Sequence, residues 1–138
     1  MKNTLLGTWK LNVDRSMADP GPLVRSEIRV YEALDDDGLR LTVQGSDASD
    51  APYSYGATGK VDGKDYPLTG SGTRNGSDST SWKRIDPYIV ESEVKRKGNV
   101  VNLVRLEVSK DLKVLTLSER GTDSDGRATR GVRIYDRQ

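Results

Sequence analysis

Apolar and polar residues alternate along most of the chain, which is the pattern of β-strands that are buried on one face only. Leu39, Leu41 and Val43 form one such set of alternating apolar positions. Clusters of Gly and Asp separate these segments at intervals of about 8–14 residues, the turn spacing of all-β folds. The pattern predicts strands near residues 6–13, 24–34, 39–43, 53–59, 64–69, 80–85, 88–95, 100–108, 113–120 and 129–136.

Only short turns separate these segments, which favours an antiparallel up-and-down meander. Closing the meander into a barrel removes its exposed edges. We therefore predict an all-β fold, a single antiparallel up-and-down β-barrel of about ten strands that spans residues 1–138 as one domain. Residues 14–22 contain Asp-Pro-Gly-Pro and are expected to form a loop with at most one helical turn, so no helical lid is predicted. Residues 14–22 and the Gly/Ser-rich residues 70–78 are candidate lids.

The composition agrees with a thin core. Apolar residues make up 33% of the chain, against about 45–50% in typical globular domains. A barrel suits this composition because each strand buries only every second residue. Disorder is the alternative for so polar a chain, but the regular alternation argues against it.

The absence of His and Cys restricts the chemistry of any site. A Ser-His-Asp triad, a His-ligated haem and most zinc sites are impossible without these residues. The Asp-rich segments 35–37 and 123–126 do not match the spacing of a calcium-binding EF-hand, and turn formation explains them. We therefore expect neither a cofactor nor a metal ion, and any acid–base work would use Asp, Glu, Lys, Tyr or Arg.

The charges nearly cancel, with 22 Lys and Arg against 21 Asp and Glu. Because no basic stripe is present, a nucleic-acid partner is not expected. Residues 1–9 contain no apolar leader segment, and no apolar run has the length of a membrane span. We expect a cytoplasmic protein without a membrane partner, acting as a monomer or a homodimer.

The two ends of the chain resemble known barrel families. The opening Leu-Gly-Thr-Trp-Lys-Leu, residues 6–11, is similar to the first strand of lipocalins and intracellular fatty-acid-binding proteins, where a Trp plugs one end of the barrel. The chain also resembles small bacterial lipocalin-like proteins of the calycin group, which share Gly-Thr-Trp-Lys-Leu-Asn and a central Lys-Arg-Ile-Asp, here residues 83–86. The resemblance implies a barrel with Trp9 as a plug at one end, on whose ring an arginine could stack. The alternative is that Trp9 lines a pocket.

The closing Arg133-Ile134-Tyr135 resembles the last strand of the fatty-acid-binding proteins. In that family an Arg-x-Tyr pair points inward and binds the ligand carboxylate, with help from an arginine on an earlier strand. The resemblance implies that Arg133 and Tyr135 bind a ligand, with Arg105 as the helper. Alternation alone leaves the other orientation open, with Val132 and Ile134 inside.

Three aromatic residues and one carboxylate complete the candidates. Tyr53 and Tyr55 share a strand face, and Trp82 lies on a nearby predicted strand, so the three rings either stack on a ligand or fill the core. Glu91 would be a base of raised pKa if it faced the interior, and an ordinary exposed residue otherwise.

These residues predict a binding protein for a small apolar or amphipathic ligand, such as a fatty acid, an isoprenoid or a polyketide. The alternative is a cofactor-independent cyclase or isomerase acting on a polyketide-like or terpenoid-like substrate, with Glu91, Tyr135 and Arg133 as the candidate catalytic groups. A third possibility is an interaction module with a packed interior.

Overall fold

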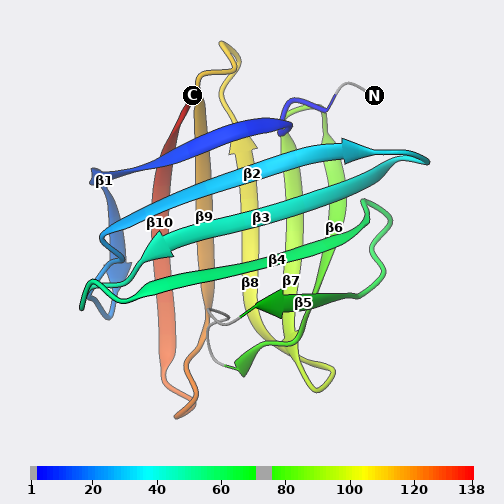
Figure 1. Cartoon of the computed structure of the whole chain (residues 1–138). Coiled ribbons are helices and arrows are strands. Elements are labelled where there is room, and N and C mark those ends of the chain that lie inside the picture. The colour runs from blue at the N-terminus through cyan, green and yellow to red at the C-terminus, as the bar shows by residue number, and fades with distance from the viewer. Residues whose placement is uncertain (1–2, 71–75) are drawn as a thin grey trace.

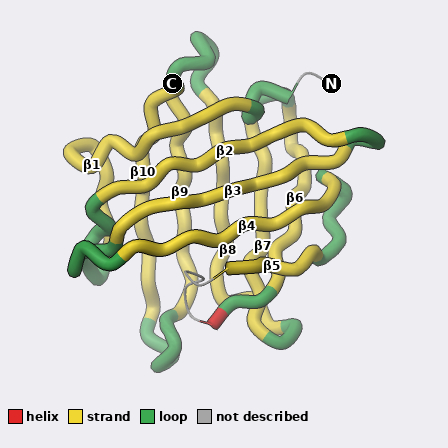
Figure 2. Tube along the Cα trace, viewed as in Figure 1, coloured by secondary structure: helices red, strands yellow, loops and turns green. Residues whose placement is uncertain are grey.

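The structure is a computed structural model that describes residues 3–70 and 76–138, and the described strands form one closed barrel (Figure 1). The strands are β1 (Gly7–Asp19), β2 (Ser26–Leu34), β3 (Gly38–Ser46), β4 (Pro52–Lys60), β5 (Tyr66–Gly70), β6 (Ser79–Asp86), β7 (Ile89–Arg96), β8 (Asn99–Val108), β9 (Val114–Thr122) and β10 (Ala128–Arg137). Figure 2 shows almost only strands and turns over these residues. The predicted all-β, up-and-down barrel is confirmed.

Every strand pairs antiparallel with its neighbour in sequence, and β1 closes the barrel against β10. Figure 1 shows β2, β3 and β4 crossing in front of β7 to β10, so the two halves of the barrel form facing layers. Alternate residues of each strand fill the space between these layers, and most of the buried apolar side chains form one core. No helix in the described ranges is long and apolar enough to cross a membrane.

The segment after the first predicted strand differs from expectation. Residues 14–19 belong to β1 instead of a loop. The pairing of β1 with β10 shifts register between Asn12 and Met17. Ser16 spans this irregularity, because its hydroxyl donates to the carbonyl of Asn12 and accepts from the backbone N–H of Ile134. The strand therefore bends without ending, which the alternation of apolar residues does not reveal.

The first of the two segments expected to act as lids is largely part of β1. The stretch between β1 and β2 is short and contains no helix, in agreement with the predicted absence of a helical lid. Most of the predicted lid at 70–78 lies at residues 71–75, outside the described residues. The loop expected from residue 44 is also shorter than predicted, because β3 continues to Ser46.

Trp9 plugs the barrel, as predicted. Its ring is buried, and its indole N–H donates to the carbonyl of Leu5 at 2.9 Å. The guanidinium of Arg137 lies 4.1 Å from the ring centroid and donates to the carbonyls of Thr4 and Leu6. Gly7 has φ +135°, and a Cβ there would lie 2.4 Å from a guanidinium nitrogen of Arg137. The Gly7-Thr8-Trp9 sequence therefore makes room for the arginine that covers the tryptophan.

Replacing Arg137 by Lys should lower the free energy of unfolding by about 1–3 kcal/mol, because a lysine keeps the charge but loses the planar stacking and the fork of donors. The measurement is urea denaturation followed by circular dichroism. Arg130→Lys is the matched control, since that side chain is 72% exposed and its change should stay within about 0.5 kcal/mol. Equal effects of the two substitutions would contradict the role given to Arg137.

Candidate functional site

The inner face of β2 carries charged and phenolic side chains where the core would be expected. Glu27, Arg29 and Tyr31 are buried, whereas Ile28 between them is 42% exposed. Pairing with β3 explains this orientation, because Arg29 lies opposite Val43, a core residue, and cross-strand partners share a face. The register of the sheet therefore places a carboxylate and a guanidinium inside the barrel.

The carboxylate of Glu27 is the centre of this cluster, and only 2% of the residue is exposed. It accepts hydrogen bonds from Arg133 Nη1 at 3.2 Å, from the Tyr53 hydroxyl at 2.7 Å and from the Tyr135 hydroxyl. Arg29 Nη2 lies 3.5 Å from its second oxygen. Burial raises the pKa of Glu27, but the two arginines and the two phenols hold that pKa below its ordinary value of 4.5.

The phenols act as hydrogen-bonding partners of the charged groups. Arg29 Nη1 donates to the Tyr31 hydroxyl at 3.0 Å, and Arg29 Nη2 donates to the Tyr55 hydroxyl at 3.1 Å. Burial raises the pKa of Tyr135 well above its ordinary value, and burial together with Glu27 raises the pKa of Tyr53. Both phenols therefore keep their protons and donate hydrogen bonds to the carboxylate of Glu27.

Arg133 has an edge that the described residues do not satisfy. The residue is 3% exposed, and Nη1 is used by Glu27, but Nε and Nη2 have no hydrogen-bond partner in the described part of the chain. Nη2 lies 3.8 Å from Glu119 Oε1, beyond hydrogen-bond range. Arg29 Nε is also without a partner there. A buried unpaired donor costs about 1–3 kcal/mol, so these N–H groups mark a place where an acceptor would be stabilised.

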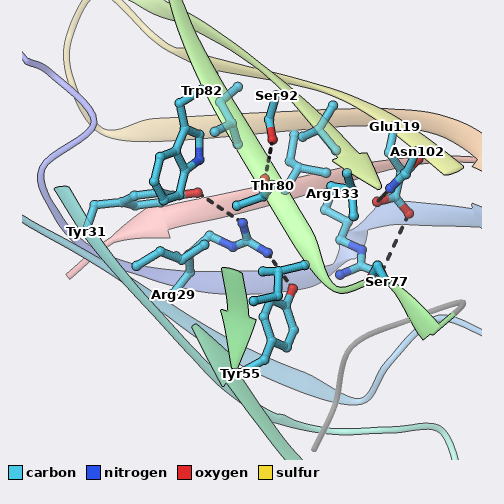
Figure 3. A pocket seen from close by; sticks show the side chains of 16 residues that line it. Arg29, Tyr31, Tyr55, Ser77, Thr80, Trp82, Ser92, Asn102, Glu119 and Arg133 are labelled. Atoms are coloured by element: carbon cyan, nitrogen blue, oxygen red, sulfur yellow. Dashed lines mark hydrogen bonds and ion pairs between the residues drawn. The ribbon is translucent and has the colours of Figure 1, made fainter. Parts of the chain in front are cut away.

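A cavity of about 80 Å³ adjoins these donors. Figure 3 shows its polar side chains arriving from opposite walls, with Arg29, Tyr31 and Tyr55 on one side and Arg133, Asn102 and Glu119 on the other. Trp82 and leucines of β3, β8 and β9 supply an apolar side. The cavity thus combines a cationic region with a small apolar surface. Within the described ranges, no group of three or more acidic side chains is placed to hold a metal ion.

The predicted binding residues divide into three groups. Arg133, Tyr55 and Trp82 line the cavity. Tyr53 and Tyr135 also point inward, but their hydroxyls contact Glu27 and they are not part of the cavity wall. The predicted inward orientation of the closing strand is confirmed, and the role of each residue in binding stays a prediction.

Arg105 and Glu91 belong to the outer surface. Their side chains are 50% and 49% exposed, and they lie 4.0 Å from each other. The reason is register, because Glu91 pairs with Arg105 while their neighbours Ser92 and Leu106 face the interior. The expectation that Arg105 assists Arg133 is therefore wrong. Of the two orientations left open for Glu91, the structure shows the exposed one, so Glu91 is not an interior base. Arg29 is the arginine that accompanies Arg133 inside the barrel.

Glu27, Arg29 and Glu119 were missed in the sequence. The apolar residues Ile28 and Val30 suggest the opposite orientation for β2, so its alternation misleads. Glu119 carried a usable signal, since it continues the inward series Leu115, Leu117 along β9.

Comparison with known proteins supports the fold. No protein-family model matches the chain, and no curated protein matches it significantly. Among solved structures, the chain is similar to Rv2717c from M. tuberculosis, with 16% identity, coverage of 98% of this chain and 93% of that one, and a TM-score of 0.62. The wild-type fluorescent protein UnaG is 14% identical, with coverage of 96% of this chain and 96% of that one and a TM-score of 0.61. The redesigned β-barrel mFAP1 bound to DFHBI is 13% identical, with coverage of 97% of this chain and 95% of that one and a TM-score of 0.51.

At these identities the likeness shows the fold alone. The closed ten-strand antiparallel barrel of this chain agrees with the barrel architecture of these neighbours. Membership of a particular family stays a prediction.

Replacing Glu27 by Gln should lower the free energy of unfolding by about 3–5 kcal/mol, because two buried guanidinium groups lose the charge that compensates them. Urea denaturation measures the change. Glu91→Gln is the control, because it removes a carboxylate of the same type from the outer face and should cost less than about 0.5 kcal/mol. A loss no larger than that of Glu91→Gln would contradict the role of Glu27.

Stability should also depend on pH through Glu27. Since its pKa is lower in the folded protein than the ordinary value of 4.5, the charged form stabilises the fold fully above that value, and the stabilisation is lost as the pH falls through the lowered pKa. Urea midpoints measured from about pH 6 to about pH 3 should therefore fall less steeply for Glu27→Gln than for the wild type. Parallel profiles of the two proteins would show that Glu27 is not responsible.

Proposed function

We propose that the barrel binds one small amphipathic molecule whose anionic head, a carboxylate in the simplest case, bonds to Arg133 inside the cavity. The observation that carries the proposal is the edge formed by Arg133 Nε and Nη2, which is buried and has no hydrogen-bond partner among the described residues. The N–H groups on this edge are side by side and parallel, so they match the two oxygens of a carboxylate. The resemblance of the closing strand to that of fatty-acid-binding proteins points to the same chemistry.

The charges of the interior support an anionic ligand. Arg29 and Arg133 bring two positive charges into the barrel, and the low pKa of Glu27 keeps one negative charge opposite them. Among the described residues one positive charge is left, which either an ionised Glu119 or a ligand anion can compensate. Because charges interact more strongly inside a protein than in water, this charge favours an anion whenever Glu119 is neutral.

The size of the cavity limits the ligand. Its 80 Å³ is well below the roughly 300–1,000 Å³ of typical ligand pockets, and a cavity of about 150 Å³ is known to hold benzene. A long fatty acid, an isoprenoid or a polyketide would enter only if the wall moved apart. We therefore propose a short carboxylic acid, with its apolar part against Trp82 and Leu106. The redesigned barrel mFAP1, to which this chain is similar, is bound to DFHBI, which supports ligand binding by such an architecture.

No specific observation favours the alternative of a cyclase or isomerase. Glu91 lies outside, Tyr135 keeps its proton, and the low pKa of Glu27 makes that carboxylate a weak base. The hypothesis of an interaction module requires a fully packed interior, and the cavity argues against it.

Binding can be measured with the two tryptophans of the chain, because Trp82 lines the cavity and Trp9 does not. In a titration with acetate, propionate and butyrate, the indole ¹⁵N–¹H signal of Trp82 should shift and saturate while that of Trp9 stays in place. The corresponding neutral amides should bind more weakly, since they lack the charge. The proposal fails if none of the acids shifts Trp82, or if both indoles shift alike.

Arg133→Lys tests the edge itself. Lysine keeps the positive charge opposite Glu27 but has no parallel pair of N–H groups, so the affinity for the acids should fall about tenfold or more. Arg105→Lys changes the same residue type on the outer face and should titrate like the wild type. Equal affinities of Arg133→Lys and the wild type would exclude bidentate binding at this edge.

A further inference from the structure

Glu119 stands beside the edge of Arg133 to which the proposed ligand would bind. It lies on the inner face of β9, its side chain is 14% exposed, and it lines the same cavity. Oε1 is 3.8 Å from Arg133 Nη2, and Oε2 accepts a hydrogen bond from Asn102 Nδ2 at 3.3 Å. A ligand carboxylate bonded to Nε and Nη2 would therefore share Nη2 with the carboxylate of Glu119. Two carboxylates at such a short separation do not both stay ionised in a buried site without a large cost.

We propose that an anion binds at Arg133 together with a proton that Glu119 takes up from solvent, so that Glu119 couples the affinity for anions to the pH. This inference rests on the proposed function, since it concerns the same site. The proton goes from solvent to a carboxylate oxygen of Glu119, and the ligand stays ionised on the guanidinium. The negative charge of Glu119 beside Arg133 is thereby replaced by the negative charge of the ligand.

The charges of the groups described around Glu119 cancel both before and after the anion binds. Arg133 approaches from β10, Asn102 from β8, and Arg29 and Glu27 from β2 across the barrel. With Glu27 ionised, the two arginines leave one positive charge, which an ionised Glu119 compensates before binding. After binding, the ligand compensates that charge and Glu119 is neutral. The charges of Glu27, Arg29, Arg133 and Glu119 together with the ligand therefore sum to zero before and after binding, with Tyr55 also facing Glu119 as a neutral phenol. Binding of the anion without a proton would leave this set with a net negative charge.

The surroundings of Glu119 favour uptake of the proton. Burial raises the pKa of Glu119 above its ordinary value, the charge of Glu27 acts in the same direction, and Asn102 and Arg29 oppose them. Linkage makes the effect reciprocal, so an anion that raises this pKa further binds more tightly when the proton is available. Affinity should therefore rise as the pH falls, by at most about tenfold per pH unit for one proton.

Methanesulfonate is a suitable probe, because it stays ionised over the whole range and its own titration cannot produce the effect. Isothermal titration calorimetry in two buffers of different ionisation enthalpy gives the number of protons taken up at each pH. Between about pH 8 and about pH 5 the wild type should take up a measurable fraction of one proton and bind more tightly as the pH falls. This measurement needs no substitution and so does not depend on the folding of a variant.

Glu119→Gln should abolish the proton uptake and the pH dependence. Gln has the same shape without the charge, so its affinity near pH 8 should match or exceed that of the wild type near about pH 5. Glu91→Gln removes a carboxylate from the outer face and should behave like the wild type. Far-UV circular dichroism shows whether each variant is folded.

The outcomes separate the two proposals. Binding of methanesulfonate or acetate without proton uptake would overturn the role of Glu119 and leave the binding function standing. Uptake that persists in Glu119→Gln would have the same consequence. Failure of both anions to bind to the wild type and to Glu119→Gln at any pH would overturn the binding function and the coupling together.

Discussion

The buried carboxylate of Glu27 is the interaction on which the interior of this barrel depends. Removing two guanidinium groups from water is costly, and their burial is tolerable only when a nearby negative charge and additional hydrogen bonds compensate them. Glu27 meets this requirement by contacting both Arg29 and Arg133 and by accepting from two phenols. These contacts join β2, β4 and β10, so one ionised side chain connects strands that lie far apart in the sequence.

The cluster also decides what the cavity can do. Glu27 uses Nη1 of Arg133 and the hydroxyls of Tyr53 and Tyr135, and it thereby leaves only the Nε–Nη2 edge of Arg133 for another group. The resemblance to fatty-acid-binding proteins implied that Arg133 and Tyr135 would hold the ligand together. In this chain the hydroxyl of Tyr135 donates to Glu27, and the group beside the free edge of Arg133 is Glu119, 3.8 Å from Nη2.

Local sequence rules predict the architecture well. Alternation and turn spacing identify the ten strands, because these features depend on neighbours in the chain. The resemblance of the opening motif identifies Trp9 as a plug, whereas the arginine stacked on its ring comes from the other end of the chain. These rules fail where the pairing between strands determines the length of a strand or the face that it turns inward. The irregularity between Asn12 and Met17 extends β1 past its apparent end, and the register of β2 against β3 turns Glu27 and Arg29 inward against the apolar pattern. The resemblance placed Arg105 beside Arg133, and alternation left Glu91 open to either face. The register of β7 against β8 places both side chains outside.

The central claim is that Arg133 offers a buried guanidinium edge to an anion. The most direct test follows the Nε–H signals of the arginine side chains by ¹⁵N–¹H NMR during titration with acetate, with Arg133 assigned from the signal missing in Arg133→Lys. The account predicts that the Arg133 signal moves downfield and saturates with the same dissociation constant as the Trp82 indole. An Arg133 signal that stays in place while acetate saturates the protein, or movement confined to arginines of the outer surface, would contradict it.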